Sequence, residues 1–374
     1  MKRRKKVALL CSVSMLMLSV YSSGAYAVSG GTGEASSPYL IATAADFYDI
    51  AADPSANYKI VNDIELSYEI PETDFSGTLD GNGCLITYSG DDAVFSKISG
   101  TVTDLRVNNT STVTTSVLAD TITGTVERCS IDGSIASKEG VAGGFATAID
   151  GAVIKDCYSE VSLSGSAQSA GGIAGTAVDS QLTNCYVNGD ISGSGSEVGV
   201  IIGKAENTSL TSCYYNSSKT SVGFGVCVGS DTTTPLDNST MKSSASFAGF
   251  DFNGTWSIIE GSGTPMLSVY NGRGTAQEPY RIHSGNELMS IVKPVIKDST
   301  KYYELCADIS GDITSLGDSD NQFMGHFDGN GYVISSEIGS NSSYNGIFSV
   351  IGEGAEVKNI TRNVTKYKTA TISG

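Results

Sequence analysis

Four cysteines at regular spacing are the first residues in the sequence that could carry chemistry. They are Cys129, Cys157, Cys185 and Cys213, each 28 residues after the last. An exposed thiol beside a base can act as a nucleophile, and clustered thiols can bind zinc or form disulfides. However, the only histidines are His283 and His326, outside this series, and the chain has no CxxC pair. The pattern therefore predicts neither a catalytic cysteine nor a metal site.

The 28-residue period extends to the apolar residues around the cysteines. It is shared by Val126, Ile154, Leu182 and Leu210, and by Val117, Phe145, Ile173 and Ile201. Such a period indicates a solenoid, and alternation of inward and outward residues within each unit indicates strands. No helical pattern of ten or more residues separates the units. We therefore predict an all-β fold, a parallel β-helix whose rungs stack about 4.8 Å apart.

In such a fold the four cysteines form a column on successive rungs. Their Cβ atoms point the same way about 4.8 Å apart, which exceeds the preferred Cβ distance of a disulfide. The main prediction is a buried structural ladder of free thiols that behave as small hydrophobic residues. A strained disulfide between neighbouring rungs is the alternative, because an exported protein meets an oxidising environment.

A second column lies one residue along and points outward. It consists of Tyr158, Tyr186 and Tyr214, with Glu160 and Asn188 two residues further on. Stacked rings could stabilise the sheet by pairing between rungs. Alternatively, the rings could pack on sugar faces while the acid and the amide bind hydroxyl groups. These five residues are the candidate ligand-binding residues.

A longer repeat divides the chain into modules. "GTGEASSPYLI" from Gly31 returns as "GRGTAQEPYRI" from Gly272, and "FSGTLDGNG" from Phe75 as "FMGHFDGNG" from Phe323. We expect a complete module at 28–268 and the start of a second at 269–374. Capping-box patterns at Thr43 and Ser284 predict a short helix that closes the first rung of each module. The single tryptophan, Trp256, is expected to close the other end of the first β-helix.

The acidic turns contain carboxylates that could act as catalysts or calcium ligands. Asp80 and Asn82, like Asp328 and Asn330, stand in "DGNG", the composition of a tight turn with local side-chain hydrogen bonds and glycines at positive φ. We interpret these four residues as structural. "GDSDNQFMG" lacks the glycine and final glutamate of an EF-hand loop, which leaves weak calcium binding there as an alternative. No metal and no cofactor are predicted.

Charge and the amino-terminal segment bear on localisation. Residues 1–27 have a basic start, an apolar run and small residues flanking the end, which predicts a cleaved secretory signal peptide. Its removal changes the formal net charge from -17 to about -22. Nucleic acid and anionic membranes are therefore poor partners, and no later stretch predicts a membrane span. We expect a secreted or cell-surface protein.

The glycine motifs complete a family resemblance. "AGGIAG" followed by "LTNCYVNGDISG", together with "EVGVIIG" and "LTSCYYN", resembles the GLUG repeat of bacterial surface proteins. The resemblance implies a right-handed β-helix in an adhesin-like protein. We therefore expect a non-enzymatic scaffold that binds an extracellular glycan or surface protein, or serves as a spacer.

Two enzymatic alternatives remain. One is a polysaccharide-degrading lyase or hydrolase, and the other is the stalk of a larger secreted enzyme. General acid–base cleavage needs paired carboxylates on one surface, and the sequence shows no second acidic pair aligned with Asp91 and Asp92. A cluster of at least three carboxylates and bases in one outward groove would favour the first alternative.

Overall fold

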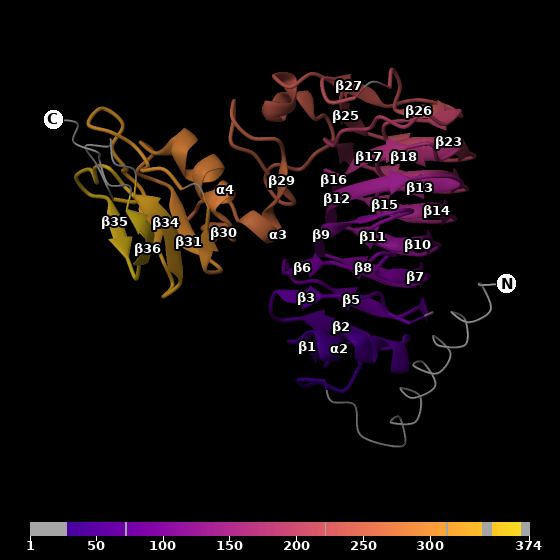
Figure 1. The fold of residues 1–374 in the computed structure, drawn as a ribbon, viewed down its shortest axis with the longest axis horizontal. Coiled ribbons are helices and arrows are strands. Elements are labelled where there is room, and N and C mark those ends of the chain that lie inside the picture. Colours follow the sequence, from indigo (N-terminus) through magenta and orange to yellow (C-terminus); the bar gives the residue numbers. More distant parts are fainter. Residues whose placement is uncertain (1–27, 72, 221, 312, 339–345, 368–374) are drawn as a thin grey trace.

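The computed structural model describes residues 28–71, 73–220, 222–311, 313–338 and 346–367. The expected signal peptide at residues 1–27 lies outside the described residues. The rest confirms the all-β prediction: short parallel strands stack into a β-solenoid with a second, shorter one beside it (Figure 1). Within the described residues, no helix is both long enough and apolar enough to cross a membrane.

Three parallel sheets form the walls of the first β-helix, because each strand pairs with the strand one turn further along the chain. The first sheet contains, in order, β1 (Tyr39–Ile41), β2 (Asn57–Ile60), β5 (Thr78–Asp80), β8 (Thr101–Thr103), β11 (Thr125–Glu127), β15 (Val153–Lys155), β20 (Gln181–Thr183) and β24 (Ser209–Thr211). The second contains β4 (Asp74–Phe75), β7 (Phe95–Ile98), β10 (Ala119–Ile122), β14 (Ala146–Asp150), β19 (Ala174–Val178), β23 (Ile202–Glu206) and β26 (Val226–Val228).

The third sheet carries the outward tyrosine column. It contains β3 (Ile64–Leu66), β6 (Leu85–Tyr88), β9 (Arg106–Val113), β12 (Ser130–Ser137), β16 (Tyr158–Ser159), β21 (Tyr186–Val187), β25 (Tyr214–Asn216) and β27 (Thr234–Leu236), with β17 (Ser162–Gly165) also paired to β12. A small side sheet contains β13 (Val141–Gly143), β18 (Ser169–Gly171) and β22 (Glu197–Val198).

The 28-residue period sets the register of these sheets. Val126 pairs with Ile154, and Ile154 pairs with Leu182, as the spacing predicts. The residue before each cysteine of the ladder has a left-handed backbone, with φ of 50°, 51°, 53° and 51° at Arg128, Asp156, Asn184 and Ser212. Each turn therefore bends at the same place, and this keeps the cysteines and tyrosines in straight columns.

A short helix closes the first rung, as the capping-box pattern predicts. It consists of α2 (Ala44–Tyr48) followed by the 3-10 turn η1 (Asp49–Ala52). Thr43 accepts the backbone N–H of Asp46, and the Asp46 carboxylate accepts the backbone N–H of Thr43. Phe47 and Ile50 are fully buried in the core of the β-helix.

The segment at 240–271 lies along the side of the first β-helix, which corrects the expectation for Trp256. The segment includes η2 (Thr240–Lys242), η3 (Ser244–Ser246), the antiparallel pair β28 (Trp256–Ser257) and β29 (Met266–Leu267), and α3 (Ser268–Asn271). Trp256 is fully buried, and its Nε1 donates to Asp156 at 3.2 Å. It therefore covers the flank of the β-helix and does not close the end.

The second module repeats the construction on a smaller scale. One sheet contains β30 (Tyr280–Ile282), β31 (Tyr302–Leu305), β33 (His326–Asp328) and β35 (Glu356–Lys358), and the other contains β32 (Ile309–Ser310), β34 (Val333–Ile338) and β36 (Thr361–Tyr367). Its capping helix consists of α4 (Gly285–Glu287), the π-helical η4 (Leu288–Val292) and the 3-10 turn η5 (Lys293–Val295).

Two contacts hold the second module and the end of the covering segment against the first β-helix. Arg106 Nη2 lies 2.6 Å from Glu287 Oε1, and both side chains are largely buried. Tyr270 Oη lies 2.7 Å from the carbonyl oxygen of Leu105 and 2.6 Å from that of Arg128. Glu287, which lies in the capping helix of the second module, therefore also joins the two modules.

Candidate functional site

The cysteine ladder lies inside the first β-helix. Cys129, Cys157, Cys185 and Cys213 are at most 1% exposed, and all are free thiols. Each sulfur faces two main-chain carbonyls; Cys157 Sγ lies 3.2 Å from the Lys155 oxygen and 3.6 Å from that of Val126. Burial raises the pKa of Cys157 well above its usual value, so the neutral thiol is favoured. This environment suits a structural residue and opposes nucleophilic chemistry.

The tyrosine column points away from the β-helix core, but it is not exposed, which corrects the idea of a glycan-binding strip. Tyr158, Tyr186 and Tyr214 are 8%, 0% and 5% exposed. Tyr158 and Tyr186 stack with ring centroids 5.1 Å apart, and both rings contact Trp256. The covering segment fills the outer faces of the rings, so no sugar can stack on them.

Glu160 and Asn188 are likewise engaged within the protein. Asn188 Nδ2 donates to Glu160 Oε1, and Asn216 Nδ2 donates to Asn188 Oδ1, both at 2.8 Å. Burial raises the pKa of Glu160, and the hydrogen bond from Asn188 opposes that rise. Tyr158, Glu160 and Tyr186 do line a cleft of about 340 Å³ between the modules. Asn188 and Tyr214 do not line this cleft.

Both "DGNG" blocks form tight turns. Asp80 Oδ1 accepts the N–H of Asn82 at 2.7 Å, and Asp328 Oδ1 accepts that of Asn330 at 2.9 Å. Asn82 and Asn330 have φ of 53° and 49°, the left-handed conformation that asparagine tolerates. The acids therefore bind their own main chain, as a structural role requires. Among the described residues, no group of three or more His, Cys, Asp or Glu side chains could hold a metal ion.

The outer face of the sheet β30-β31-β33-β35 carries a different kind of row. Strand register places Tyr302 beside His326 and His326 beside Glu356. The Tyr302 and His326 rings stack with centroids 4.3 Å apart and planes 12° from parallel. His326 Nδ1 lies 3.8 Å from Glu356 Oε2. An aromatic platform therefore ends in a carboxylate that is 52% exposed.

A charged row runs parallel to the aromatic one, two residues along each strand. Glu304, Asp328 and Lys358 are neighbours in register. Lys358 Nζ lies 3.7 Å from both Asp328 Oδ2 and Glu356 Oε2, which links the two rows. Burial alone would raise the pKa of Asp328, but hydrogen bonds from Asn330 and Asn359 and the charge of Lys358 lower it. Asp328 is therefore a carboxylate at neutral pH and can accept hydrogen bonds.

The two rows border one depression, also lined by Ala276 and Pro279, with a volume of about 260 Å³. This is close to the lower end of the range of ~300–1,000 Å³ for small-ligand pockets, which suits one monosaccharide-sized group. It contains three carboxylates, Glu304, Asp328 and Glu356, together with one base, His326, and one cation, Lys358. The cluster named above as favouring an enzyme is therefore present, on the second module.

The first module lacks this row, although its strands have the same register. Asn57 and Thr78 stand where the second module has Tyr302 and His326, and Thr101 stands in place of Glu356. The inward positions stay aromatic or apolar; for example, Tyr58 corresponds to Tyr303. Comparing the two copies residue by residue would have located Tyr302 and His326 from sequence alone.

The fold defines the chain as a β-solenoid protein, and comparisons with known proteins add little beyond that. No protein-family model matches the chain, so the resemblance to GLUG-repeat proteins stays a prediction, and no curated protein matches it significantly. A similar solved structure is that of a "putative immunoglobulin A1 protease" from Bacteroides ovatus, 18% identical with a TM-score of 0.49. The match covers 64% of this chain and 94% of that chain. The likeness concerns the fold alone.

Proposed function

We propose that the protein is an exported, adhesin-like β-helix scaffold that binds a neutral sugar unit of an extracellular glycan on the outer face of its second module. The observation that carries this proposal is the stacked Tyr302–His326 pair bordered by carboxylates. The amino-terminal sequence at residues 1–27 supports export.

The chemistry of the depression fits a sugar. A pyranose offers an apolar face of C–H groups to the Tyr302 ring, and its hydroxyls can donate to the Asp328 and Glu356 carboxylates. Around the depression, Lys358 and Arg281 offset two of the three negative charges. The site is therefore close to neutral, which favours an uncharged saccharide.

The test exchanges residues between the module copies. The double variant Tyr302→Asn/His326→Thr places the residues of the first module in the second, where the same strand register accepts them. Removing the stacking platform should weaken binding to neutral oligosaccharides roughly three- to tenfold, the equivalent of about 0.5–1.5 kcal/mol for an aromatic contact. Titration calorimetry against gluco-, galacto- and xylo-oligosaccharides measures this, and Thr78→Ala in the first module is the matched control. Equal affinity in the double variant and the native protein would contradict the proposal.

A second candidate function is polysaccharide cleavage, favoured by the position of His326 between Tyr302 and Glu356. In that case one carboxylate or the histidine acts as a general acid or base. Incubation of the native protein with neutral and acidic polysaccharides, followed by assays for new reducing ends and unsaturated products, tests it. Products that vanish in Glu356→Gln would favour the enzyme; binding without products favours the scaffold.

A further inference from the structure

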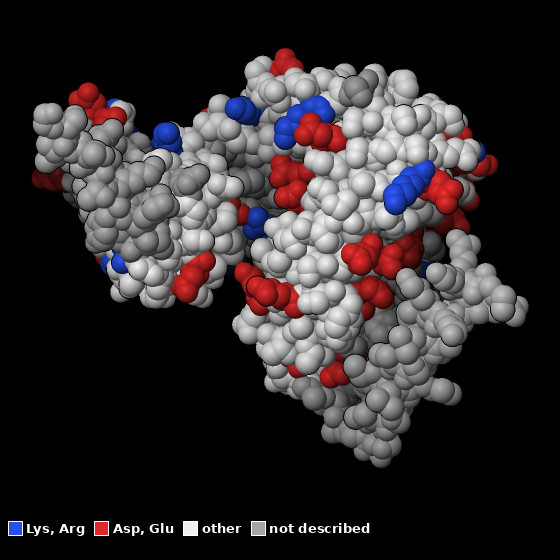
Figure 2. Space-filling view, in the orientation of Figure 1, with Lys and Arg blue, Asp and Glu red and all other residues white. Residues whose placement is uncertain are grey.

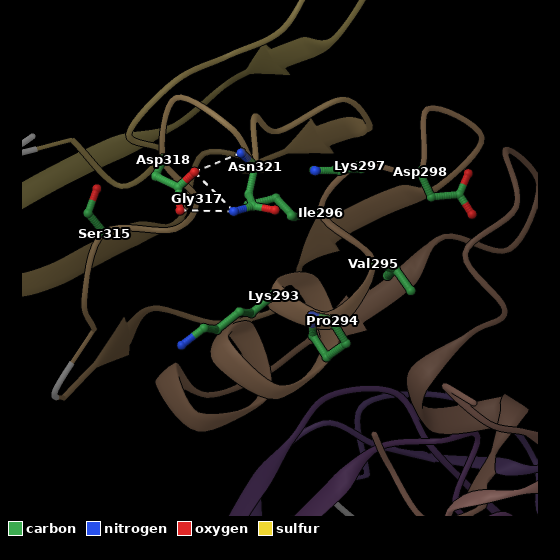
Figure 3. A pocket seen from close by; sticks show the side chains of 10 residues that line it. All are labelled: Lys293, Pro294, Val295, Ile296, Lys297, Asp298, Ser315, Gly317, Asp318 and Asn321. Carbon is green, nitrogen blue, oxygen red and sulfur yellow. Dashed lines mark hydrogen bonds between the residues drawn. The ribbon is translucent and has the colours of Figure 1, made fainter. Parts of the chain in front are cut away.

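A larger groove lies on another part of the second module, beside its capping helix. It has a volume of about 700 Å³ and is lined on one side by residues 293–298, from Lys293 to Asp298, and on the other by Ser315, Gly317, Asp318 and Asn321. Figure 3 shows the Lys297 side chain directed toward Asn321, whereas the Lys293 side chain points away from Asn321. Backbone turns and aliphatic side chains make up the rest of the lining.

The acids of this groove are already satisfied by their own turns. Asp318 accepts the backbone N–H groups of Asp320 and Asn321 and the side-chain amide of Asn321. The hydrogen bond from the Asn321 side chain, with those backbone bonds, lowers the pKa of Asp318. Asp298 likewise accepts the N–H and hydroxyl of Thr300, at 2.9 and 2.7 Å. The calcium alternative for this loop is weakened, because the carboxylates are occupied and two lysines face the same space.

The lysines have no such partners. In the part of the chain that the structure describes, neither Lys293 nor Lys297 forms an ion pair within 4.0 Å, and both are exposed. Lys293 begins the 3-10 turn η5 and Lys297 follows the end of that turn, so both cations lie on the same side of the groove. An anion bound in the groove would be attracted by both.

The stretch that lines one side of this groove is longer in the second module than in the first. Seven residues separate Ile50 from Tyr58 in the first module, and the only charged one is Asp53. The equivalent stretch from Ile291 to Tyr303 contains eleven residues, with three lysines and one aspartate. The longer stretch adds Lys293 and Lys297, which balance Asp298 and Asp318 in the lining of the groove, in a chain whose net charge is -17. Figure 2 shows acidic side chains in scattered patches on the visible surface.

We propose that this groove binds an acidic polysaccharide, whose carboxylate or sulfate groups pair with Lys293 and Lys297. Two cations on one side of the groove suit anions repeated along a flexible chain. The Asn321 side-chain oxygen can accept from sugar hydroxyls, since Asn321 Nδ2 and the Ser315 hydroxyl are already bonded within the protein. The site is separate from the outer face with Tyr302 and His326, and does not depend on the function proposed for it.

The test uses the full exported chain at low ionic strength with three immobilised polymers: polygalacturonate, dextran sulfate and neutral dextran. We expect binding to at least one polyanion, which weakens as salt is added, and none to neutral dextran. Preference for polygalacturonate identifies carboxylates as the ligand, and preference for dextran sulfate identifies sulfates. The variant Lys293→Gln/Lys297→Gln should bind about tenfold more weakly, since each exposed charge contact contributes modestly.

Matched controls separate local from general charge effects. Lys138→Gln/Lys204→Gln removes the same charge from the first module and should leave the affinity unchanged. Tyr302→Asn/His326→Thr should also leave it unchanged, which distinguishes this site from the neutral-sugar site. Equal losses in the two lysine pairs, or the absence of binding to both polyanions at low salt, would overturn the proposal.

Discussion

The covering segment at 240–271 should open without unfolding the β-helix when Tyr186 is truncated. Tyr186 is fully buried, its hydroxyl donates to the Pro265 carbonyl at 2.5 Å, and its ring centroid lies 5.9 Å from that of Trp256. It belongs to the apolar cluster between the segment and the flank, separate from the main core. The Tyr186→Ala change therefore removes a contact that the segment needs and the core does not.

The expected loss of stability of the covering segment has two separable parts, the ring contacts and the hydrogen bond. Truncating a fully buried aromatic side chain costs about 3–5 kcal/mol. Tyr186→Phe keeps the ring and removes only the hydrogen bond to Pro265, which leaves a buried carbonyl short of a donor and costs about 1–3 kcal/mol. Because these energies stabilise the covering segment, the alanine variant should populate the open form and the phenylalanine variant should not.

The assay uses the fact that Trp256 is the only tryptophan of the chain. In Tyr186→Ala we expect its emission to shift to the red and its quenching by acrylamide to increase, while the far-ultraviolet circular dichroism of the β-helix is retained. Tyr332→Ala, at a side chain 38% exposed, is the control and should change neither signal. Tryptophan emission in Tyr186→Ala identical to that of the native protein would refute the reasoning. Loss of the circular dichroism signal together with the change in emission would also refute it, because the β-helix would then have unfolded.

Two further predictions concern the contact between modules and the close packing around Gly171. Burial alone would raise the pKa of Glu287, but the hydrogen bond from His283 and the charge of Arg106 lower it from 4.5 to about 2. The lowered pKa means that ionised Glu287 stabilises the folded state by on the order of 3 kcal/mol above about pH 4, and this stabilisation is lost as pH falls through 2. The difference in unfolding free energy between the native protein and Glu287→Gln, measured by urea titration, should therefore shrink over that range. Gly171→Ala should cost about 3 kcal/mol or more, because a Cβ would lie 2.4 Å from the Ala174 oxygen and 2.6 Å from that of Ile201. Gly223→Ala, where a Cβ meets nothing within 4 Å, should leave the urea midpoint almost unchanged.

The parts of the fold that depend on local periodicity could be predicted from the sequence. The 28-residue spacing from Cys157 to Cys185 and from Ile154 to Leu182 predicts the register, because each rung stacks directly on the last. The cover over Tyr186 could not be predicted, since the contact of Trp256 with Asp156 joins residues 100 positions apart, and the covering segment has no period. Periodicity shows that a side chain points outward, but not what then packs on it.

The candidate site shows a second limit of prediction from sequence. Aligning the two copies without gaps places Ala355 at the position of Val102, whereas strand register places Val357 there. A two-residue insertion in the turn before β35 therefore brings Glu356 beside His326, and an ungapped comparison misplaces it. Tyr302 and His326 precede the insertion and could be found; their carboxylate neighbour could not.

The divergence between the copies also explains why the binding surfaces are proposed on the second module. Inward positions are restricted by stacking about 4.8 Å apart, so they keep their apolar character in both copies. Outward positions are free to change only where nothing covers them. On the first module, the covering segment occupies the tyrosine column and the Arg106–Glu287 contact holds the second module beside it. The outer face around Tyr302 is uncovered in the described structure, and there substitutions can change the surface without disturbing the core.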